Sequence, residues 1–238
     1  MSLYNVHESA RPLPKSHQPL FDVWLSGQVM LKDVLRWKAW VNVQGTRPQS
    51  TLQHTYALIM LTINFVDRLQ PFVKLNLELL IRAVAIHDHG EGELHRDVLL
   101  KDKTDHQDLQ EYLAFVERYK DLPGFPKFRT AFLLQFAEKR PANFPPIALE
   151  TFKSLINHCP REIAAFQALE NLDYLLYAVE QRLIMDNRDC LAQVLLNARP
   201  ILDRLSPQLP GLKSTFWTPE FIAWCEEMAV GGNTAVPK

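Results

Sequence analysis

Three side chains that could share one chemical task, His87, Asp88 and Glu91, follow directly after an apolar run over residues 75–86. In this run the apolar residues recur at three- and four-residue intervals, which is typical of a buried helix. Ionisable groups at the edge of an apolar layer are costly unless they are paired or hold a metal ion. His87 and Asp88 can both reach one ion above the helix end, and Glu91 shares that face if the helix continues. A polar, solvated helix end at Gly90 is the alternative interpretation.

Two further candidate ligands lie far away in the chain, each inside a predicted helix. His54 falls in the first turns of one apolar helix, and Asp173 falls in the longest helical run, over residues 161–186. Together with the His-Asp pair they form a set of two imidazoles and two carboxylates, which suits a divalent cation with open positions for water and substrate oxygens. The ligand types accept Mn, Co, Fe, Ni, Zn or Mg, so the sequence predicts one divalent ion without naming the metal.

The order of these residues resembles that of the HD-domain superfamily of metal-dependent phosphohydrolases. Within the superfamily, the chain is most similar to the bacterial 5′-deoxynucleotidases and their relatives, over roughly residues 30–185. The resemblance rests on these residues, in chain order: Arg36-Trp37, His54, His87-Asp88, Glu91, Asp97 and Asp173.

The resemblance implies a role for each of these positions. The ligands of one divalent ion would be His54, His87, Asp88 and Asp173. Glu91 would orient or deprotonate a water near the ion, and Asp97 would contact the substrate or assist the leaving oxygen. Arg36 would lie near the phosphate. Trp37 would lie near the sugar, where a flat ring can exclude a 2′-hydroxyl by shape.

A phosphate-binding site also requires cationic side chains, because a phosphate dianion needs hydrogen-bond donors besides the metal. Arg96 is the further candidate for this contact, and Arg47, Lys101 and Lys103 are weaker ones, since each taken singly is more often a solvated charge. The loop that bears Arg96, Lys101 and Lys103 could supply the additional charge that a triphosphate needs.

These features predict hydrolysis of a small nucleotide, a nucleoside 5′-monophosphate with a deoxyribose first among them. A nucleoside triphosphohydrolase is one alternative. A two-metal HD oxygenase is another, with extra ligands among His89, His95, His106 and His158, although the spacing favours structural or surface roles for these histidines. A noncatalytic nucleotide-binding protein belongs to a different class and stays open.

Composition restricts the other function classes. The formal net charge is −1 and the isoelectric point about 6.7, so no basic field is expected for a nucleic-acid polymer. Three cysteines without short spacing predict buried thiols in a reducing cytosol. The start of the chain lacks a signal-peptide pattern, and no apolar stretch has the length of a membrane helix. We therefore expect a soluble cytoplasmic protein with a small-molecule nucleotide substrate; a homodimer is compatible with the sequence.

The periodicity predicts an all-α fold, because strand-like alternation is nearly absent. The resemblance refines this prediction to an HD-domain helical bundle with extra N- and C-terminal segments. We expect an extended, proline-containing arm over residues 1–28, the HD domain over 29–205, and a C-terminal helix with a polar tail over 206–238. The HD domain should begin with a helix over residues 29–40.

Overall fold

Helices dominate the computed structural model, which describes residues 15, 30–37, 46–94 and 103–230. Helix accounts for 75% of these residues and strand for 2%, so the predicted helical class is confirmed. The expected arm, apart from residue 15, and the polar tail after residue 230 lie outside the described residues.

The first described elements are short and differ from the prediction. Helix α2 (Leu31–Asp33) ends at Asp33, and strand β1 (Leu35–Arg36) pairs antiparallel with strand β2 (Gln49–Ser50). The predicted helix over residues 29–40 is therefore wrong at residues 34–37, and residues 29 and 38–40 lie outside the described residues. The backbone turns extended at Val34, whose carbonyl oxygen accepts a hydrogen bond from the Thr51 amide. Tertiary pairing has overridden an amphipathic pattern that fits a helix equally well.

Three helices then lead through the middle of the chain. Helix α4 (Thr51–Leu69) starts at a capping box in which Ser50 and Gln53 satisfy each other's backbone amides. Helix α5 (Leu77–Ile86) is capped by the Asn76 side chain. Helix α6 (His89–Leu94) follows after only two residues, His87 and Asp88. The predicted ligand pair therefore occupies the joint between two helices.

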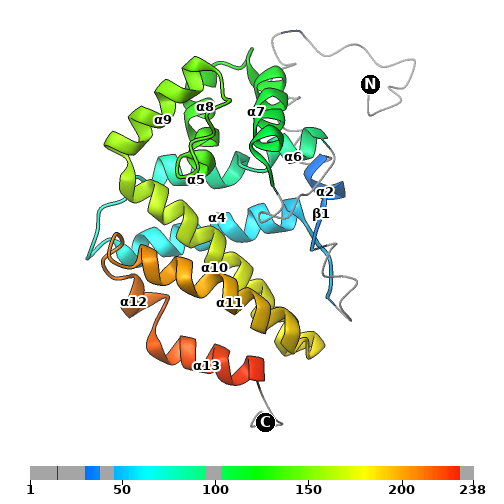
Figure 1. Cartoon of the computed structure of the whole chain (residues 1–238), viewed down its shortest axis with the longest axis vertical. Helices are drawn as coiled ribbons and strands as arrows, with labels where there is room; N and C mark the ends of the chain where they lie inside the picture. Colours follow the sequence, from blue (N-terminus) through cyan, green and yellow to red (C-terminus); the bar gives the residue numbers. More distant parts are fainter. Residues whose placement is uncertain (1–14, 16–29, 38–45, 95–102, 231–238) are drawn as a thin grey trace.

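The remaining helices complete the bundle. They are α7 (Asp105–Tyr119), α8 (Phe125–Leu133), the 3₁₀ turn η3 (Leu134–Phe136), α9 (Pro146–His158), α10 (Pro160–Met185), α11 (Arg188–Leu205), α12 (Leu212–Thr215) and α13 (Pro219–Val230). Figure 1 shows α10 crossing the middle of the molecule, with α4 on one side and α11 on the other. Helix α13 packs beyond α11. Helix α10 is thus placed to carry side chains into the centre of the bundle.

One core connects these helices. Phe115 of α7 stacks on Phe132 of α8 with ring centroids 4.0 Å apart, and Trp217 after α12 is fully buried. The Trp217 indole nitrogen donates a hydrogen bond to Asp203 of α11, which ties the C-terminal helices to the rest. Within the described ranges, none of the helices is both long and apolar enough to cross a membrane.

Candidate metal centre

The start of α4 fixes His54 in the interior. The hydroxyl of Thr51 donates a hydrogen bond to the carbonyl oxygen of Val34, which anchors the first turn of α4 beside the β1–β2 pair. His54 lies one turn later and is fully buried. An imidazole in such a place needs partners for both ring nitrogens, because an unpaired buried polar atom is costly.

The joint between α5 and α6 positions the second imidazole. The His87 Nδ1 atom lies 2.9 Å from the carbonyl oxygen of Val84, so this nitrogen donates and Nε2 is directed elsewhere. Gly90 permits α6 to lie against α7, since a Cβ at this position would come within 2.6 Å of the Glu111 backbone oxygen. The alternative interpretation, a polar, solvated helix end at Gly90, is therefore wrong, because Gly90 is a buried packing residue inside α6.

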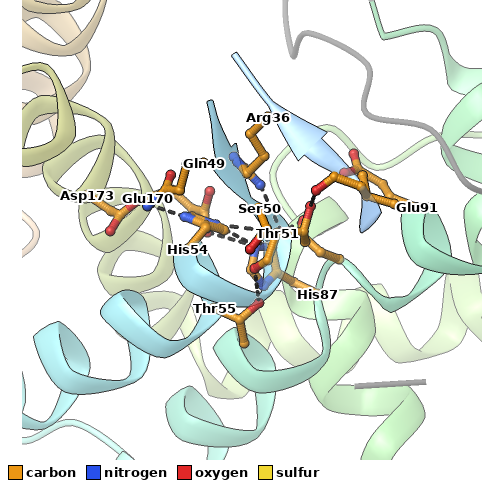
Figure 2. Close-up of polar contacts among 12 residues, drawn as sticks. Arg36, Gln49, Ser50, Thr51, His54, Thr55, His87, Glu91, Glu170 and Asp173 are labelled. Carbon is orange, nitrogen blue, oxygen red and sulfur yellow. Dashed lines mark hydrogen bonds and ion pairs between the residues drawn. The ribbon is translucent and has the colours of Figure 1, made fainter. Parts of the chain in front are cut away.

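Four side chains from three parts of the chain converge here, and Figure 2 labels His54, His87 and Glu170 among them. The Nε2 atoms of His54 and His87 lie 3.2 Å apart. Oδ1 of Asp88 is 3.1 Å from Nε2 of His87, and Oδ2 of Asp88 is 3.6 Å from Nε2 of His54. Oε1 of Glu170, on α10, lies 3.2 Å from Nε2 of His87 and 3.8 Å from Nε2 of His54. Two imidazoles and two carboxylates thus face one point.

This group fits a divalent cation. Ligand atoms of His54, His87 and Glu170 all lie within 4.8 Å of one another, the one such group found among the described residues. Oε1 of Glu170 is buried and has no hydrogen-bond partner among the described residues, as expected for an oxygen directed at a cation. Mixed imidazole and carboxylate donors suit the borderline divalent metals.

Asp173 lies on the other side of His54. Its Oδ2 atom is 2.7 Å from Nδ1 of His54, whereas Nε2 of His54 faces His87. The structure therefore brings Asp173 to the centre, but against the nitrogen that faces away from the ligand atoms. A carboxylate in this position orients a ligating imidazole and fixes its tautomer. Glu170, which the sequence analysis did not select, lies one helical turn before Asp173; that spacing was the available signal.

Arg36 and Tyr174 border the centre. Arg36 is buried; its Nη1 donates to Oδ2 of Asp88 at 2.8 Å and its Nη2 to the Tyr174 hydroxyl at 2.8 Å. The Trp37 ring stacks on Tyr177 with centroids 4.8 Å apart and is only 8% exposed. Arg36 thus lies beside the ligand candidates and Trp37 packs against Tyr177, while the predicted contacts of both residues with a substrate stay predictions.

Electrostatics reflect this crowding. Burial lowers the pKa of His87, but Asp88 and Glu170 raise it more, to about 9. Burial acts to raise the pKa of Asp88, yet His87 and Arg36 hold it well below its usual range. The metal-free centre is therefore a charge-paired cluster with a protonated His87 and an ionised Asp88 at neutral pH.

Glu91 lies beside this cluster on α6, and a buried ammonium contacts it. Lys103 Nζ is 3.1 Å from Oε1 of Glu91 and 2.6 Å from Oε2 of Glu111. Lys103 is thus engaged by carboxylates, which removes it from the candidate phosphate contacts. Arg96 and Asp97, the remaining predicted substrate and catalytic residues, lie outside the described residues.

The histidines considered for a second metal are dispersed. His89 is buried, with Nδ1 2.6 Å from the Tyr119 hydroxyl, while His106 and His158 are exposed. His95 lies outside the described residues. A hollow elsewhere on the molecule is lined in part by Arg140, and none of the predicted site residues lines it.

The chain was compared with family models, with curated proteins and with solved structures, and none of the three comparisons gave a match.

Proposed function

We propose that this protein is a divalent-metal-dependent phosphohydrolase with an HD-domain helical bundle. Its substrate in this proposal is a small nucleotide, a nucleoside 5′-monophosphate with a deoxyribose. One observation carries the proposal. The Nε2 atoms of His54 and His87 lie 3.2 Å apart, and carboxylate oxygens of Asp88 and Glu170 lie close to them. The order of the His residues and the His-Asp pair in the chain supports the same class.

The ligands in this proposal are His54, His87, Asp88 and Glu170, with Asp173 holding His54 in its ligating tautomer. A divalent ion held by these residues would supply Lewis acidity toward a phosphate oxygen and would lower the pKa of a bound water.

The protein's own groups perform the remaining tasks. Glu91 takes a proton from the attacking water, since burial raises the pKa of its carboxyl to about 8 and so makes the carboxylate a stronger base. Arg36 turns part of its guanidinium toward the phosphate, for which a planar, permanently charged donor is well suited. Tyr174 supports this guanidinium from the other side.

The charge at the site favours a monophosphate. Arg36 is the cation described at the centre, and Lys103 is neutralised by its carboxylates. A triphosphate needs more positive charge than this arrangement offers. The alternative of a nucleoside triphosphohydrolase therefore depends on Arg96 and Lys101.

The experiment is a screen of nucleoside mono-, di- and triphosphates with Mn, Co, Fe, Ni, Zn and Mg, in which phosphate, pyrophosphate and triphosphate are measured separately. The proposal predicts phosphate and nucleoside from monophosphates, with chelator abolishing the reaction. Release of intact triphosphate would favour the alternative enzyme. Tight nucleotide binding by metal-free protein, without any released product, would identify a binding protein instead.

We place the reaction in a reducing cytosol, in line with the thiols of Cys159, Cys190 and Cys225. All three are free, and burial raises the pKa of each thiol, so none is set up as a reactive thiolate.

A further inference from the structure

A second buried ionic assembly lies next to the metal centre, and its middle is Lys103. The ammonium of Lys103 contacts Glu111 at 2.6 Å, Glu91 at 3.1 Å and Asp108 at 3.9 Å. All four side chains are at least 90% shielded from solvent. An ammonium group buried so deeply among carboxylates has a specific structural or chemical task, because desolvation of each charge is costly.

The fold builds this assembly from two helices held in close contact. Gly90 lets α6 approach the Glu111 backbone on α7, which brings Glu91 of α6 beside Glu111. Thr104 caps α7 through a capping box with Gln107, so Lys103 enters the cluster immediately before the helix begins. The geometry is thus set by backbone packing as well as by charge.

The charges in the assembly do not balance. Three carboxylates surround one buried ammonium, and the Lys139 ammonium reaches Asp108 alone, at 3.3 Å, from a half-exposed position. Oε2 of Glu91 and Oε1 of Glu111 are buried without hydrogen-bond partners among the described residues. One carboxylate of the group can therefore take up a proton at a modest cost.

We propose that Lys103 and Glu111 are positioning residues for Glu91, which hold its carboxylate beside the metal centre and set how readily it accepts a proton. The inference rests on the proposed function, in which Glu91 is the general base. It assigns to Lys103 a task different from phosphate binding. It also explains why Glu111 is buried as a charged group at the α6–α7 contact.

The direction of each effect follows from the charges that face Glu91. Burial raises the pKa of Glu91, Lys103 lowers it, and Asp88 and Glu111 raise it, with the result at about 8. Arg36 acts in the same direction as Lys103. Removing Lys103 should therefore raise the pKa of Glu91 further, whereas neutralising Glu111 should lower it. The Asp108 carboxylate faces Lys103 and stays in place in both cases.

The test measures urea unfolding of the metal-free protein from pH 5 to pH 11. Four backgrounds are compared, the unmodified chain, Lys103→Met, Glu111→Gln and the control Lys139→Met, each with and without Glu91→Gln. In each background, the difference in unfolding midpoint between the protein with Glu91 and the protein with Glu91→Gln is followed as a function of pH. The pH at which this difference changes marks the protonation of Glu91. We expect this pH to rise by about 1 to 3 units in Lys103→Met and to fall in Glu111→Gln. It should stay unchanged in Lys139→Met, because Lys139 contacts only Asp108 in this group.

The same variants are then assayed for phosphate release, and the acidic limb of the kcat/KM profile should move in the same directions. If Lys103→Met does not fold, the double variant Lys103→Met/Glu111→Gln, which keeps the net charge of the assembly, is compared with Glu111→Gln instead, and the pH should be higher in the double variant because only Lys103 differs between the two. The inference would be overturned if this pH did not fall in Glu111→Gln and did not rise on removal of Lys103 in either comparison. Shifts in unfolding without hydrolysis of any nucleotide by the unmodified chain would overturn the proposed function and leave the ionic assembly established.

Discussion

Nδ1 of His54 lies 2.7 Å from Oδ2 of Asp173, so one carboxylate holds the nitrogen that faces away from His87. Nε2 of the same ring faces Nε2 of His87 and a carboxylate oxygen of Glu170. Asp173 and Glu170, both on α10, therefore face different nitrogens of the His54 ring. Asp173 orients the ring, and Glu170 shares the ligand side of the ring with His87.

This difference predicts unequal effects of two matched truncations on metal binding. Asp173→Ala removes an orienting partner and should weaken metal affinity by about 10- to 100-fold. Glu170→Ala removes a ligand and should weaken it more. Calorimetric titration with Mn²⁺ measures both. A larger loss in Asp173→Ala would show that Asp173, as the sequence pattern implied, is itself a ligand.

Metal binding should release a proton from His87. Because its pKa is raised to about 9 in the metal-free protein, the imidazole is protonated at pH 7.5 and must lose its proton to bind a cation. Apparent metal affinity should rise with pH until about pH 9 and then level off. The raised pKa also stabilises the metal-free fold fully below about pH 6.5, and this contribution is lost as the pH rises through 9.

Calorimetry in buffers with different ionisation enthalpies counts the released protons. Close to one proton per ion is expected at pH 7.5, and the count should fall in His87→Ala. An affinity that is independent of pH between 6 and 8.5 would contradict this description of the centre.

Glu91→Gln tests the base directly. The amide keeps the shape of the side chain but cannot accept the proton, and loss of a general base costs about a hundredfold to ten-thousandfold in rate. Metal content measured on the purified variant should be unchanged, because Glu91 faces Lys103 and is not among the ligand atoms. Full activity, or loss of the metal, would assign Glu91 a different role.

The sequence predicted the parts of the centre that depend on local periodicity. His54 lies in the first turns of one apolar helix, and His87 and Asp88 directly follow another, so the motif order and the buried helices were enough to predict that they converge. Glu170 was missed because a choice between two acids three residues apart depends on the rotation of α10. Lys103 was only a weak phosphate candidate, and its carboxylate partners could not be predicted because they come from two separate helices. The predicted helix over residues 29–40 was wrong at residues 34–37, because Leu35 and Arg36 pair with a second strand that lies later in the chain.

Trp37→Ala should have two separable consequences. Loss of the ring stacked on Tyr177 should destabilise the fold by about 3–5 kcal/mol, since Trp37 is buried. If the ring also excludes a 2′-hydroxyl, activity on ribonucleotides should rise relative to deoxynucleotides by a factor equivalent to about 1–3 kcal/mol at most. Trp37→Phe, which keeps an aromatic ring in the stack, is the control. An unchanged ratio would remove Trp37 from the sugar site.

The most direct test of the central claim is phosphate release from a deoxynucleoside 5′-monophosphate by chelated protein before and after Mn²⁺ is restored. Asp88→Asn is measured in parallel, because it removes the charge of a ligand that lies 3.1 Å from Nε2 of His87 while keeping the side-chain shape. The proposed function predicts no release without metal, recovery with metal, and a loss of both bound metal and activity in Asp88→Asn. Metal-independent release, or an Asp88→Asn variant as active as the unmodified chain, would contradict a metal-dependent phosphohydrolase at this centre.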